Sequence, residues 1–541
     1  ETASHADLDG MAGRVARGLR AAGVAPGDLV AVRLGPGVQL IATLLGVLKA
    51  GAAFLPIGLD EPSGRVRALL DRSSPRLLVC AGDEPGYACR PVARLMEEPD
   101  AEEVPPPRSE PDSLAYALRT SGSTGEPKVV LVEHGGIVNA VRWKCGEYGL
   151  SGGHRMLPLF GCAFDGFILN VFAPLAAGAA VVLMEEGAER DPRAIAETIE
   201  RHRVTHLAAA PIVYRAVLGQ ARAGRLGSLT SVTLAGDVAH PDTLSRSAAR
   251  VSNEYGPAEC SVVAAYAARI GPRAPTVIGR PIDNADVYVL DPDRRLLPPG
   301  ITGEVYIGGA GLARGYLGDE ELSRREFVEW RDRRLYRTGD LARWLPDGTL
   351  EYRGRDARHL KIRGVRANLG EVTRCLLDHP RVSDAVVTVA GEDAIGAAVV
   401  LEGEASGLAG HLATRLPPHL MPACLLPVPE IPLLQSGKPD LAAITLLLEG
   451  ALGVGDAQPP ATSIERDLVG LWRDILRTDD VGVNQSFFAL GGHSLTATVL
   501  LAEIHERFGV ELSLNEVFAR STVRELAAAI AGAAGGGPTG R

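Results

Sequence analysis

The sequence has little excess charge of either sign and no basic stretch that would suit a polyanion. Acidic residues outnumber basic ones by 66 to 56, which gives a net charge of -10 at pH 7, and both kinds are spread along the chain. Binding to nucleic acid or to an anionic membrane surface requires a concentrated positive field. We therefore expect small molecules and proteins as partners, with no nucleic acid and no membrane.

Long apolar runs and leader-like segments are also missing. The longest apolar stretch, residues 166–184, contains Asn170 and Pro174, which suits a buried core better than a membrane span. Residues 1–7 have neither a basic start nor an apolar segment, and the first residue is not Met. We expect a cytoplasmic protein without an export signal, of which this chain is an excised fragment.

The cysteines show no paired spacing. The chain has 7, at positions 80, 89, 145, 162, 260, 375 and 424, so the number is odd and no CxxC occurs. We predict ordinary buried thiols in a reducing compartment.

The chain is long enough for several domains, with 541 residues of which 46% are hydrophobic. Up to about residue 344, apolar runs such as Leu29–Val32 and Leu77–Cys80 alternate with helix-like stretches such as Met11–Ala22. This alternation predicts an α/β core. Short strands with turns begin near Asp286 and indicate a β-rich subdomain. A small α+β domain is expected beyond residue 355.

The end of the chain is different in character. Residues 449–460 are rich in Gly and Pro and predict a linker. After it, Thr462 and Glu465 form a Thr-x-x-Glu capping box before apolar residues at helical spacing. Further helices are predicted after Ser494 and Ser521. We therefore expect a small all-α bundle, followed by a Gly-rich tail.

Residues 120–128, TSGSTGEPK, combine small hydroxyl side chains, two glycines and a lysine. Backbone N–H groups, hydroxyls and an ammonium together suit a polyphosphate. The stretch is not a Walker loop, because the Gly-Lys-Ser/Thr ending is absent. Taken alone, such a cluster is more often a solvated surface loop, so its meaning depends on the other motifs.

Four more segments follow it in order: NEYGPAE at 253–259, GEVYIGG at 303–309, YRTGD at 336–340 and SGK at 436–438. Together with the loop they resemble the adenylate-forming superfamily, and within it the adenylation domains of non-ribosomal peptide synthetases. The resemblance covers nearly all of the first 445 residues. The opening residues resemble the family's first conserved segment, which lies some way inside the domain, so we expect part of the core to precede residue 1.

The resemblance implies an ATP site whose roles the chemistry supports. Attack of an amino-acid carboxylate on the α-phosphate concentrates negative charge there, which fixed positive groups and Mg²⁺ must offset. Lys438 is expected beside the carboxylate and the α-phosphate, and Glu259 at the metal-binding position. The other expected residues are Thr120, Ser121, Gly122, Ser123, Thr124, Gly125 and Lys128 for the phosphates, and Glu254, Tyr255, Gly256, Asp340 and Arg355 for ribose and adenine.

Asp165 lies between apolar residues in AFDGF (163–167), where an unpaired charge is costly. The resemblance implies that it binds the substrate's α-amino group; the alternative is a cap of the following helix. A side-chain pocket is implied as well, formed by Gly166, Leu169, Ala208, Thr233, Ala235, Glu254, Val262 and Val263.

The predicted pocket is apolar except for Thr233 and Glu254. A buried carboxylate that faces a ligand asks for a charged donor such as imidazolium, guanidinium or ammonium. The combination of Thr233, Ala235, Glu254 and Val262 is similar to pockets that select histidine, so histidine or a modified histidine is our first substrate hypothesis. Asparagine is the second, because amide N–H groups also satisfy a carboxylate.

Residues 491–495, GGHSL, resemble the attachment site of a peptidyl carrier domain, and NQSFF at 484–488 agrees with it. The resemblance implies that Ser494 receives 4′-phosphopantetheine from a separate phosphopantetheinyl transferase. An ordinary serine N-cap is the alternative, and the two roles are compatible. The predicted domains are a large α/β core with a β-rich subdomain (1–354), a small α+β subdomain (355–448), a linker (449–460), an all-α carrier four-helix bundle (461–532) and a flexible tail (533–541).

Two weaker patterns are rejected and one departure is noted. His202 and His206 have the spacing of a metal pair, but Arg203 stands where a metalloprotease has Glu, so we predict no metal there. Residues 309–314 lack the last glycine of a dinucleotide fingerprint and predict a turn after a strand. At the family's hinge, Ala357 replaces the usual aspartate, which leaves the hinge behaviour open.

The resemblance implies two half-reactions. ATP and an amino acid give aminoacyl-AMP and pyrophosphate, and the carrier thiol then takes the aminoacyl group with release of AMP. The implied partners are the amino acid, the transferase, an MbtH-like helper protein and a downstream tailoring or condensation enzyme of natural-product biosynthesis. Two alternatives stay open: an acyl-CoA or aryl-acid ligase, against which Asp165 argues, and an inactive carrier scaffold, against which Lys438 argues.

Overall fold

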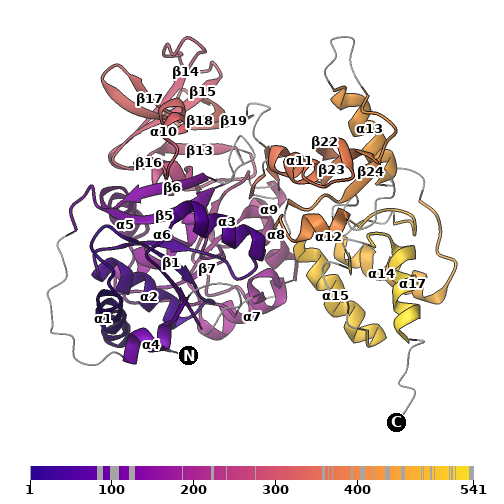
Figure 1. The fold of residues 1–541 in the computed structure, drawn as a ribbon, viewed down its shortest axis with the longest axis horizontal. Helices are drawn as coiled ribbons and strands as arrows, with labels where there is room; N and C mark the ends of the chain where they lie inside the picture. The colour runs from indigo at the N-terminus through magenta and orange to yellow at the C-terminus, as the bar shows by residue number, and fades with distance from the viewer. Residues whose placement is uncertain are drawn as a thin grey trace. The chain divides into compact units, whose positions relative to one another are not determined.

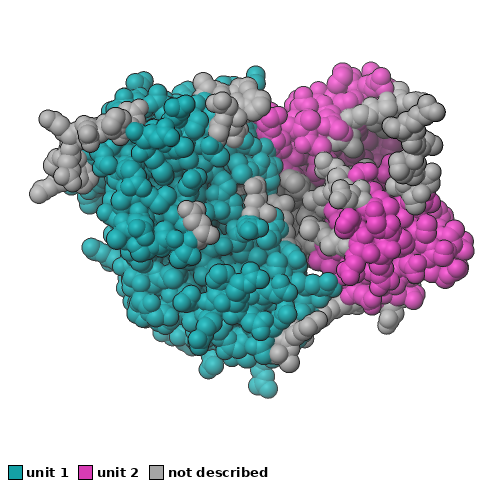
Figure 2. All heavy atoms as spheres, turned by 90° about the horizontal axis from the view of Figure 1, so that it is seen from below, with its two compact units in different colours: residues 1–61, 66–121, 127–365 teal, residues 62–65, 122–126, 366–541 magenta. Residues whose placement is uncertain are grey.

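The computed structural model comprises two units. Unit 1 contains residues 1–61, 66–121 and 127–365, and unit 2 contains residues 62–65, 122–126 and 366–541 (Figure 2). The structure describes residues 2–534 apart from 82–88, 98–108, 121–127, 186, 221–223, 239–240, 274–275, 356–359, 363–364, 368, 391–393, 403–407, 418–419, 433–438, 453–456, 477, 479–480, 488–489, 491, 493, 511, 513–515 and 518–519.

The first sheet of unit 1 has seven strands in the order β16-β6-β5-β2-β1-β3-β4. Its centre is parallel, since β1 pairs in parallel with both β2 and β3. Parallel strands covered on both faces need apolar residues throughout, and the run at residues 30–32 is fully buried. The strands are β1 (Leu29–Arg33), β2 (Ala53–Pro56), β3 (Leu77–Cys80), β4 (Arg90–Pro91), β5 (Leu114–Thr120), β6 (Lys128–Glu133) and β16 (Gly315–Tyr316), and the nearby helices are α1 (His5–Ala21), α2 (Val38–Lys49), α3 (Ser63–Ser73) and α4 (Val92–Glu97).

The second sheet has twelve strands and joins a parallel half to an antiparallel half. The parallel half is β7 (Arg155–Pro158), β8 (Ala180–Val181), β9 (His206–Ala209), β10 (Ser231–Ala235) and β11 (Arg250–Tyr255). The antiparallel half is β12 (Ala265–Ala267), β13 (Val277–Pro281), β14 (Ala285–Leu290), β15 (Gly303–Gly309), β17 (Phe327–Trp330), β18 (Arg333–Trp344) and β19 (Leu350–Arg355). Strands β14, β15 and β17 to β19 group at one end of unit 1, where we predicted a β-rich subdomain (Figure 1).

The helices beside the second sheet include α6, which begins the apolar stretch at 166–184. Its residues from Gly166 to Val171 are buried, so this part of the stretch is core as predicted, whereas Ala180 in β8 is exposed. Within the described ranges, no helix combines the length and apolar character that crossing a membrane requires. The helices are α5 (His134–Tyr148), α6 (Asp165–Ala176), η1 (Ala188–Arg190), α7 (Pro192–His202), α8 (Pro211–Gln220), α9 (Pro241–Arg246), η2 (Ala258–Cys260) and α10 (Glu320–Glu326).

The main part of unit 2 begins with a small α+β region and continues with the helices of the predicted carrier domain. Helix α13 extends to Ala451, three residues into the range predicted as a linker. The predicted fold class is confirmed. The elements are β22 (Val382–Ala390), β23 (Ala394–Leu401), β24 (Cys424–Pro427), α11 (Leu369–Leu377), α12 (Leu408–Ala413) and α13 (Leu441–Ala451), then α14 (Ser463–Leu476), α15 (Ser494–Phe508) and α17 (Val523–Ala534); the short pair β20 (Leu360–Ile362) and β21 (Val365–Ala367) precedes them.

Two of the seven cysteines are joined. Cys80 and Cys89 form a disulfide with their Cα atoms 6.2 Å apart, so our prediction of ordinary thiols is wrong for this pair. The physical reason is that β4 lies parallel to β3, with Cys80 opposite Pro91, which brings the two chain segments side by side. The other five cysteines, all within the described residues, are not part of a disulfide.

The predicted capping box of the carrier module is confirmed. Thr462 Oγ1 accepts a hydrogen bond from the backbone N–H of Glu465 at 3.1 Å, and Glu465 Oε2 accepts one from the backbone N–H of Thr462 at 2.9 Å. Two N–H groups at the start of α14 are thereby satisfied.

Replacing Thr462 by Ala should lower the free energy of unfolding of α14 by about 1 kcal/mol, because one helix-start N–H loses its acceptor. Hydrogen–deuterium exchange of the first turn of α14 in the full chain measures this as faster exchange. T462S keeps the hydroxyl and should exchange like the parent. Equal acceleration in both variants would contradict the capping role.

Candidate functional site

Four residues of the predicted side-chain pocket share one face of the parallel half of the second sheet. Thr233 on β10 lies opposite Ala208 on β9, and Ala235 lies opposite Glu254 on β11. Side chains at opposed positions of paired strands, and at alternate positions along one strand, point to the same face. The strand register therefore brings together residues that lie far apart in the sequence.

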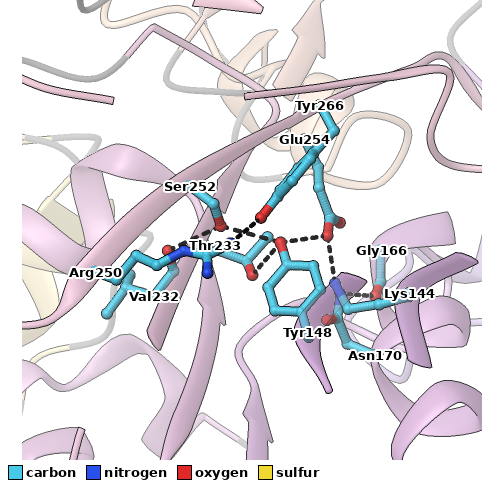
Figure 3. A network of polar contacts seen from close by, with 10 residues as sticks. All are labelled: Lys144, Tyr148, Gly166, Asn170, Val232, Thr233, Arg250, Ser252, Glu254 and Tyr266. Carbon is cyan, nitrogen blue, oxygen red and sulfur yellow. Dashed lines mark hydrogen bonds and ion pairs between the residues drawn. The ribbon is translucent and has the colours of Figure 1, made fainter. Parts of the chain in front are cut away.

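Helix α5 supplies two further polar side chains to this face. Lys144 Nζ lies 2.5 Å from Glu254 Oε1, and Tyr148 Oη donates a hydrogen bond to the same oxygen at 2.7 Å. Thr233 Oγ1 donates to Tyr148 Oη at 3.0 Å, and Ser252 Oγ lies 3.0 Å from the same hydroxyl (Figure 3). We call Ala208, Thr233, Ala235, Glu254, Lys144 and Tyr148 the side-chain site.

The ion pair of the side-chain site is buried. The Lys144 side chain is 0% exposed and that of Glu254 is 4% exposed. Burial lowers the pKa of Lys144, while the charge of Glu254 raises it; burial also raises the pKa of Tyr148 well above its usual value. Tyr148 is therefore a neutral donor to Glu254.

The ion pair corrects one of our inferences. We expected Glu254 to take its counter-charge from the ligand, and that premise is wrong because Lys144 already supplies it. The sequence did contain a signal: Ile137, Ala140 and Lys144 recur at helical spacing along the buried stripe of α5. A lysine on such a stripe needs a buried partner.

Helix α6 places two more predicted residues nearby. Gly166 and Leu169 are buried in its first turns, and Asn170 Nδ2 donates to the carbonyl oxygen of Gly166 at 2.8 Å. Added Cβ atoms at Gly166 would lie 3.0 Å from the ring of Phe160, so little room exists for a side chain there.

Asp165 is the first residue of α6. Its Oδ1 accepts a hydrogen bond from the backbone N–H of Gly166 at 2.7 Å, which stabilises the start of the helix. The alternative of a helix cap at Asp165 is wrong, because the N-cap residue of α6 is Phe164 and no side chain caps this helix. Binding a substrate ammonium stays compatible with the hydrogen bond to Gly166, because a carboxylate offers several acceptor positions.

The predicted nucleotide residues Tyr255 and Asp340 are brought together. Asp340 on β18 is buried, and its Oδ2 accepts a hydrogen bond from Tyr255 Oη at 2.7 Å. The backbone N–H of Asp340 donates to Thr338 Oγ1 at 3.0 Å, which fixes the turn of chain around the carboxylate. Arg355, the second ribose candidate, lies opposite Asp340 in the pairing of β18 with β19.

The predicted metal position Glu259 lies in η2 and is 1% exposed. Tyr316 Oη donates to Glu259 Oε1 at 2.9 Å, and Lys128 Nζ lies 4.9 Å from the centre of the Tyr316 ring. Tyr316 therefore links two residues of the predicted ATP site. We missed it because nothing in its local sequence distinguishes it from a core tyrosine.

The donor set fits Mg²⁺. Across the described part of the chain, no group of three or more His, Cys, Asp or Glu side chains could hold a metal by itself. Mg²⁺ takes only one or two protein carboxylates when substrate phosphates and water complete its shell. A single buried carboxylate at Glu259 agrees with that mode of binding.

A close backbone approach explains Gly256. A Cβ atom there would lie 2.5 Å from the carbonyl oxygen of Val262, so only glycine permits the loop that carries Val262 and Val263 to return beside β11. Val262 and Val263 are both buried.

Several predicted residues lie outside the described residues or are described only in part. Ser121, Gly122, Ser123, Thr124, Gly125 and Lys438 are outside, and so is Ala357. Thr120 is the last residue of β5. Ser494 is the first residue of α15, as predicted.

Comparison with known proteins assigns two regions of the chain to protein families. Residues 1–317 match the family described as AMP-binding enzyme, and residues 466–530 match the phosphopantetheine attachment site. The chain is 35% identical to tyrocidine synthase 3 of Brevibacillus parabrevis over 97% of its own length and 8% of that protein's. It is also 35% identical to a phosphinothricin tripeptide synthetase of Streptomyces viridochromogenes, over 96% of its length and 46% of that protein's. The chain thus spans less than half the length of these relatives.

Solved structures are similar over both units. One is the holo form of a protein containing adenylation and PCP domains, bound to a vinylsulfonamide inhibitor, with a TM-score of 0.81, 25% identity and coverage of 98% of this chain and 92% of that one. Another is a four-domain non-ribosomal peptide synthetase bound to AMP and glycine, with a TM-score of 0.61, 28% identity and coverage of 98% and 41%.

His206 provides a test of the electrostatics around the side-chain site. His206 is 5% exposed, and burial, with His154, Lys144 and Arg250 nearby, lowers the pKa of His206 from 6.5 to about 4. Because the folded-state pKa is lowered, the unfolded chain binds this proton more readily, and stability falls as the pH drops from 6.5 toward 4. The loss should be about 3 kcal/mol at most.

Urea unfolding of the full chain between pH 4 and pH 7.5 measures this dependence. H206N should flatten the slope in that window, whereas H202N, at an exposed position of α7, should keep the parent's slope. Identical slopes in H206N and the parent would show that the buried ring is not the group responsible.

Proposed function

Since the chain belongs to the AMP-binding enzymes and joins to that region a phosphopantetheine attachment site of the peptide-synthetase kind, we propose that it activates an amino acid with ATP and loads it onto its own carrier module. The observation that carries the proposal is the pair of buried carboxylates, Asp340 and Glu259. Each is held by a tyrosine hydroxyl, at 2.7 and 2.9 Å. Two such oriented carboxylates have no purpose in a passive scaffold, since each costs desolvation.

We assign a separate role in the proposed reaction to each of the predicted site residues. Asp340 would accept hydrogen bonds from the ribose hydroxyls, and Lys128, the first residue of β6, would face the phosphates with Ser121 and Thr124. Glu259 would hold Mg²⁺, which supplies positive charge to the phosphates during loss of pyrophosphate. Asp165 would bind the substrate ammonium, and Lys438 would approach the carboxylate that attacks the α-phosphate.

Ser494 at the start of α15 is the proposed attachment point of 4′-phosphopantetheine, whose thiol receives the aminoacyl group. An attachment site requires a phosphopantetheinyl transferase to modify it, and the activation step requires an amino acid. The transferase and the amino acid are therefore expected partners of this chain. We also propose an MbtH-like helper, a downstream tailoring or condensation enzyme and a cytoplasmic location.

Histidine is the substrate that we propose to test first, and asparagine the second. Both carry an N–H group that a carboxylate can accept, and both can remain uncharged beside Lys144. The arrangement at Glu254 supports such a donor, because Lys144 and Tyr148 both engage Oε1 and leave Oε2 for a ligand.

The class of reaction is tested by amino-acid-dependent exchange of pyrophosphate into ATP, over all proteinogenic amino acids, with and without an MbtH-like protein. K438A should abolish exchange, because the attacking carboxylate loses its cation. S494A should keep exchange and lose only the covalent loading of the carrier. Exchange that survives K438A, or that proceeds with carboxylic acids lacking an amino group, would contradict the proposed reaction.

Tyr316 should control the requirement for Mg²⁺. Y316F removes the hydroxyl that holds Glu259 and keeps the ring under Lys128, so we expect a several-fold higher Mg²⁺ concentration for half-maximal exchange. Y306F is the matched control, because it removes a hydroxyl that lies 3.3 Å from another glutamate, Glu304. The same Mg²⁺ requirement in Y316F and Y306F would remove Tyr316 from the metal position.

A further inference from the structure

The side-chain site contains a positive charge that comes from outside the strands which form it. Lys144 lies on α5, 110 residues before its partner Glu254 in the sequence, and its side chain is fully buried. Its ammonium also lies 4.5 Å from the centre of the Tyr148 ring, so the aromatic face adds a second favourable contact. The net charge of the Lys144–Glu254 pair is zero.

A buried ion pair of this kind is not explained by stability alone. Desolvation of two ions can exceed their mutual attraction, and apolar residues of similar volume often replace such pairs without loss. The α5 stripe is otherwise filled by Ile137 and Ala140, which shows that apolar side chains suit this packing. The charges at Lys144 and Glu254 therefore call for a role beyond holding the helix.

The geometry of the network defines which donor the site can still accept. Thr233 donates to Tyr148, Tyr148 donates to Glu254, and Lys144 meets the same Oε1 atom (Figure 3). Both of these donors engage Oε1, so Oε2 is the oxygen of Glu254 that we assign to a ligand. A substrate N–H that reaches Oε2 would meet a compensated carboxylate, whereas a substrate cation would approach Lys144 as well and be repelled.

We propose that Lys144 and Tyr148 are specificity-determining residues, which neutralise and orient Glu254 so that the side-chain site accepts an uncharged hydrogen-bonding amino-acid side chain and rejects ammonium and guanidinium groups. This inference rests on the proposed amino-acid activation. It narrows the substrate class to side chains such as a neutral imidazole or a carboxamide. Glu254 thus acts as an acceptor rather than as a counter-ion.

The experiment measures kcat/KM for pyrophosphate exchange at pH 8, where free imidazole is neutral. The panel is histidine, asparagine and glutamine, then ornithine, lysine and arginine, then aspartate and glutamate, with leucine and valine as apolar members. The parent should favour the first group over the cationic group by at least about 100-fold, since buried polar recognition discriminates strongly.

Charge-changing variants then separate recognition from structure. K144M should shift the ratio of cationic to uncharged substrates at least about tenfold toward the cations, because Glu254 is left without its counter-charge. E254Q should raise kcat/KM for acidic substrates relative to uncharged ones, because Lys144 is then left without its counter-charge. The double variant K144M/E254Q should restore the preference for uncharged side chains. Because it leaves no unpaired buried charge, it also keeps the test valid if K144M alone fails to fold. K49M removes a partly buried lysine that pairs with the exposed Asp9, and it should leave all ratios unchanged.

Three results would overturn the inference: a parent that activates ornithine, lysine, arginine or an apolar amino acid best, variants that lower kcat/KM by the same factor for every substrate, or a double variant with a cationic preference. Absence of pyrophosphate exchange by the folded parent with every amino acid tested is a different outcome. It contradicts the proposed function itself, before any variant is made.

Discussion

The buried ion pair between Lys144 and Glu254 is the interaction on which the arrangement of the side-chain site depends. The negative charge of a buried carboxylate must be compensated by a positive charge or by hydrogen bonds. Of the two groups that contact Glu254 Oε1, the Lys144 ammonium on α5 is the cation. The pair in turn fixes α5 against the face of β10 and β11 and places Tyr148 between Thr233 and Glu254. Loss of either charge would leave the other buried and unpaired, which is costlier than never having had the pair.

Strand β11 extends this constraint to the nucleotide residues. Successive side chains of a strand point to opposite faces, so Glu254 turns toward α5 while Tyr255 turns toward Asp340. The chain then passes Gly256 and enters η2, where Glu259 meets Tyr316. One short segment, residues 253–259, therefore carries a residue of the side-chain site, a partner of the ribose candidate and the metal candidate. A small displacement of β11 would therefore move Glu254, Tyr255 and Glu259 together.

The sequence was sufficient wherever a feature is local. Strand β3 has the bounds that its apolar run predicts, the capping box at Thr462 is present, and α15 begins at Ser494. Long-range pairings were out of reach, because no local pattern encodes them. The disulfide between Cys80 and Cys89 depends on the pairing of β3 with β4, and the Tyr316–Glu259 contact joins residues separated by 57 positions. Lys144 is an intermediate case: its place on a buried stripe signals a partner but does not say which one.

The most direct test of the whole account is the identity of the group that the carrier receives. The holo protein would be incubated with ATP, Mg²⁺ and an equimolar mixture of amino acids, and the peptide containing Ser494 analysed by mass spectrometry. The account predicts one predominant aminoacyl group with an uncharged hydrogen-bonding side chain, histidine or asparagine first, and its absence from S494A. A cationic or apolar aminoacyl group would contradict the role given to Lys144, and an unloaded but phosphopantetheinylated carrier would contradict the proposed activation.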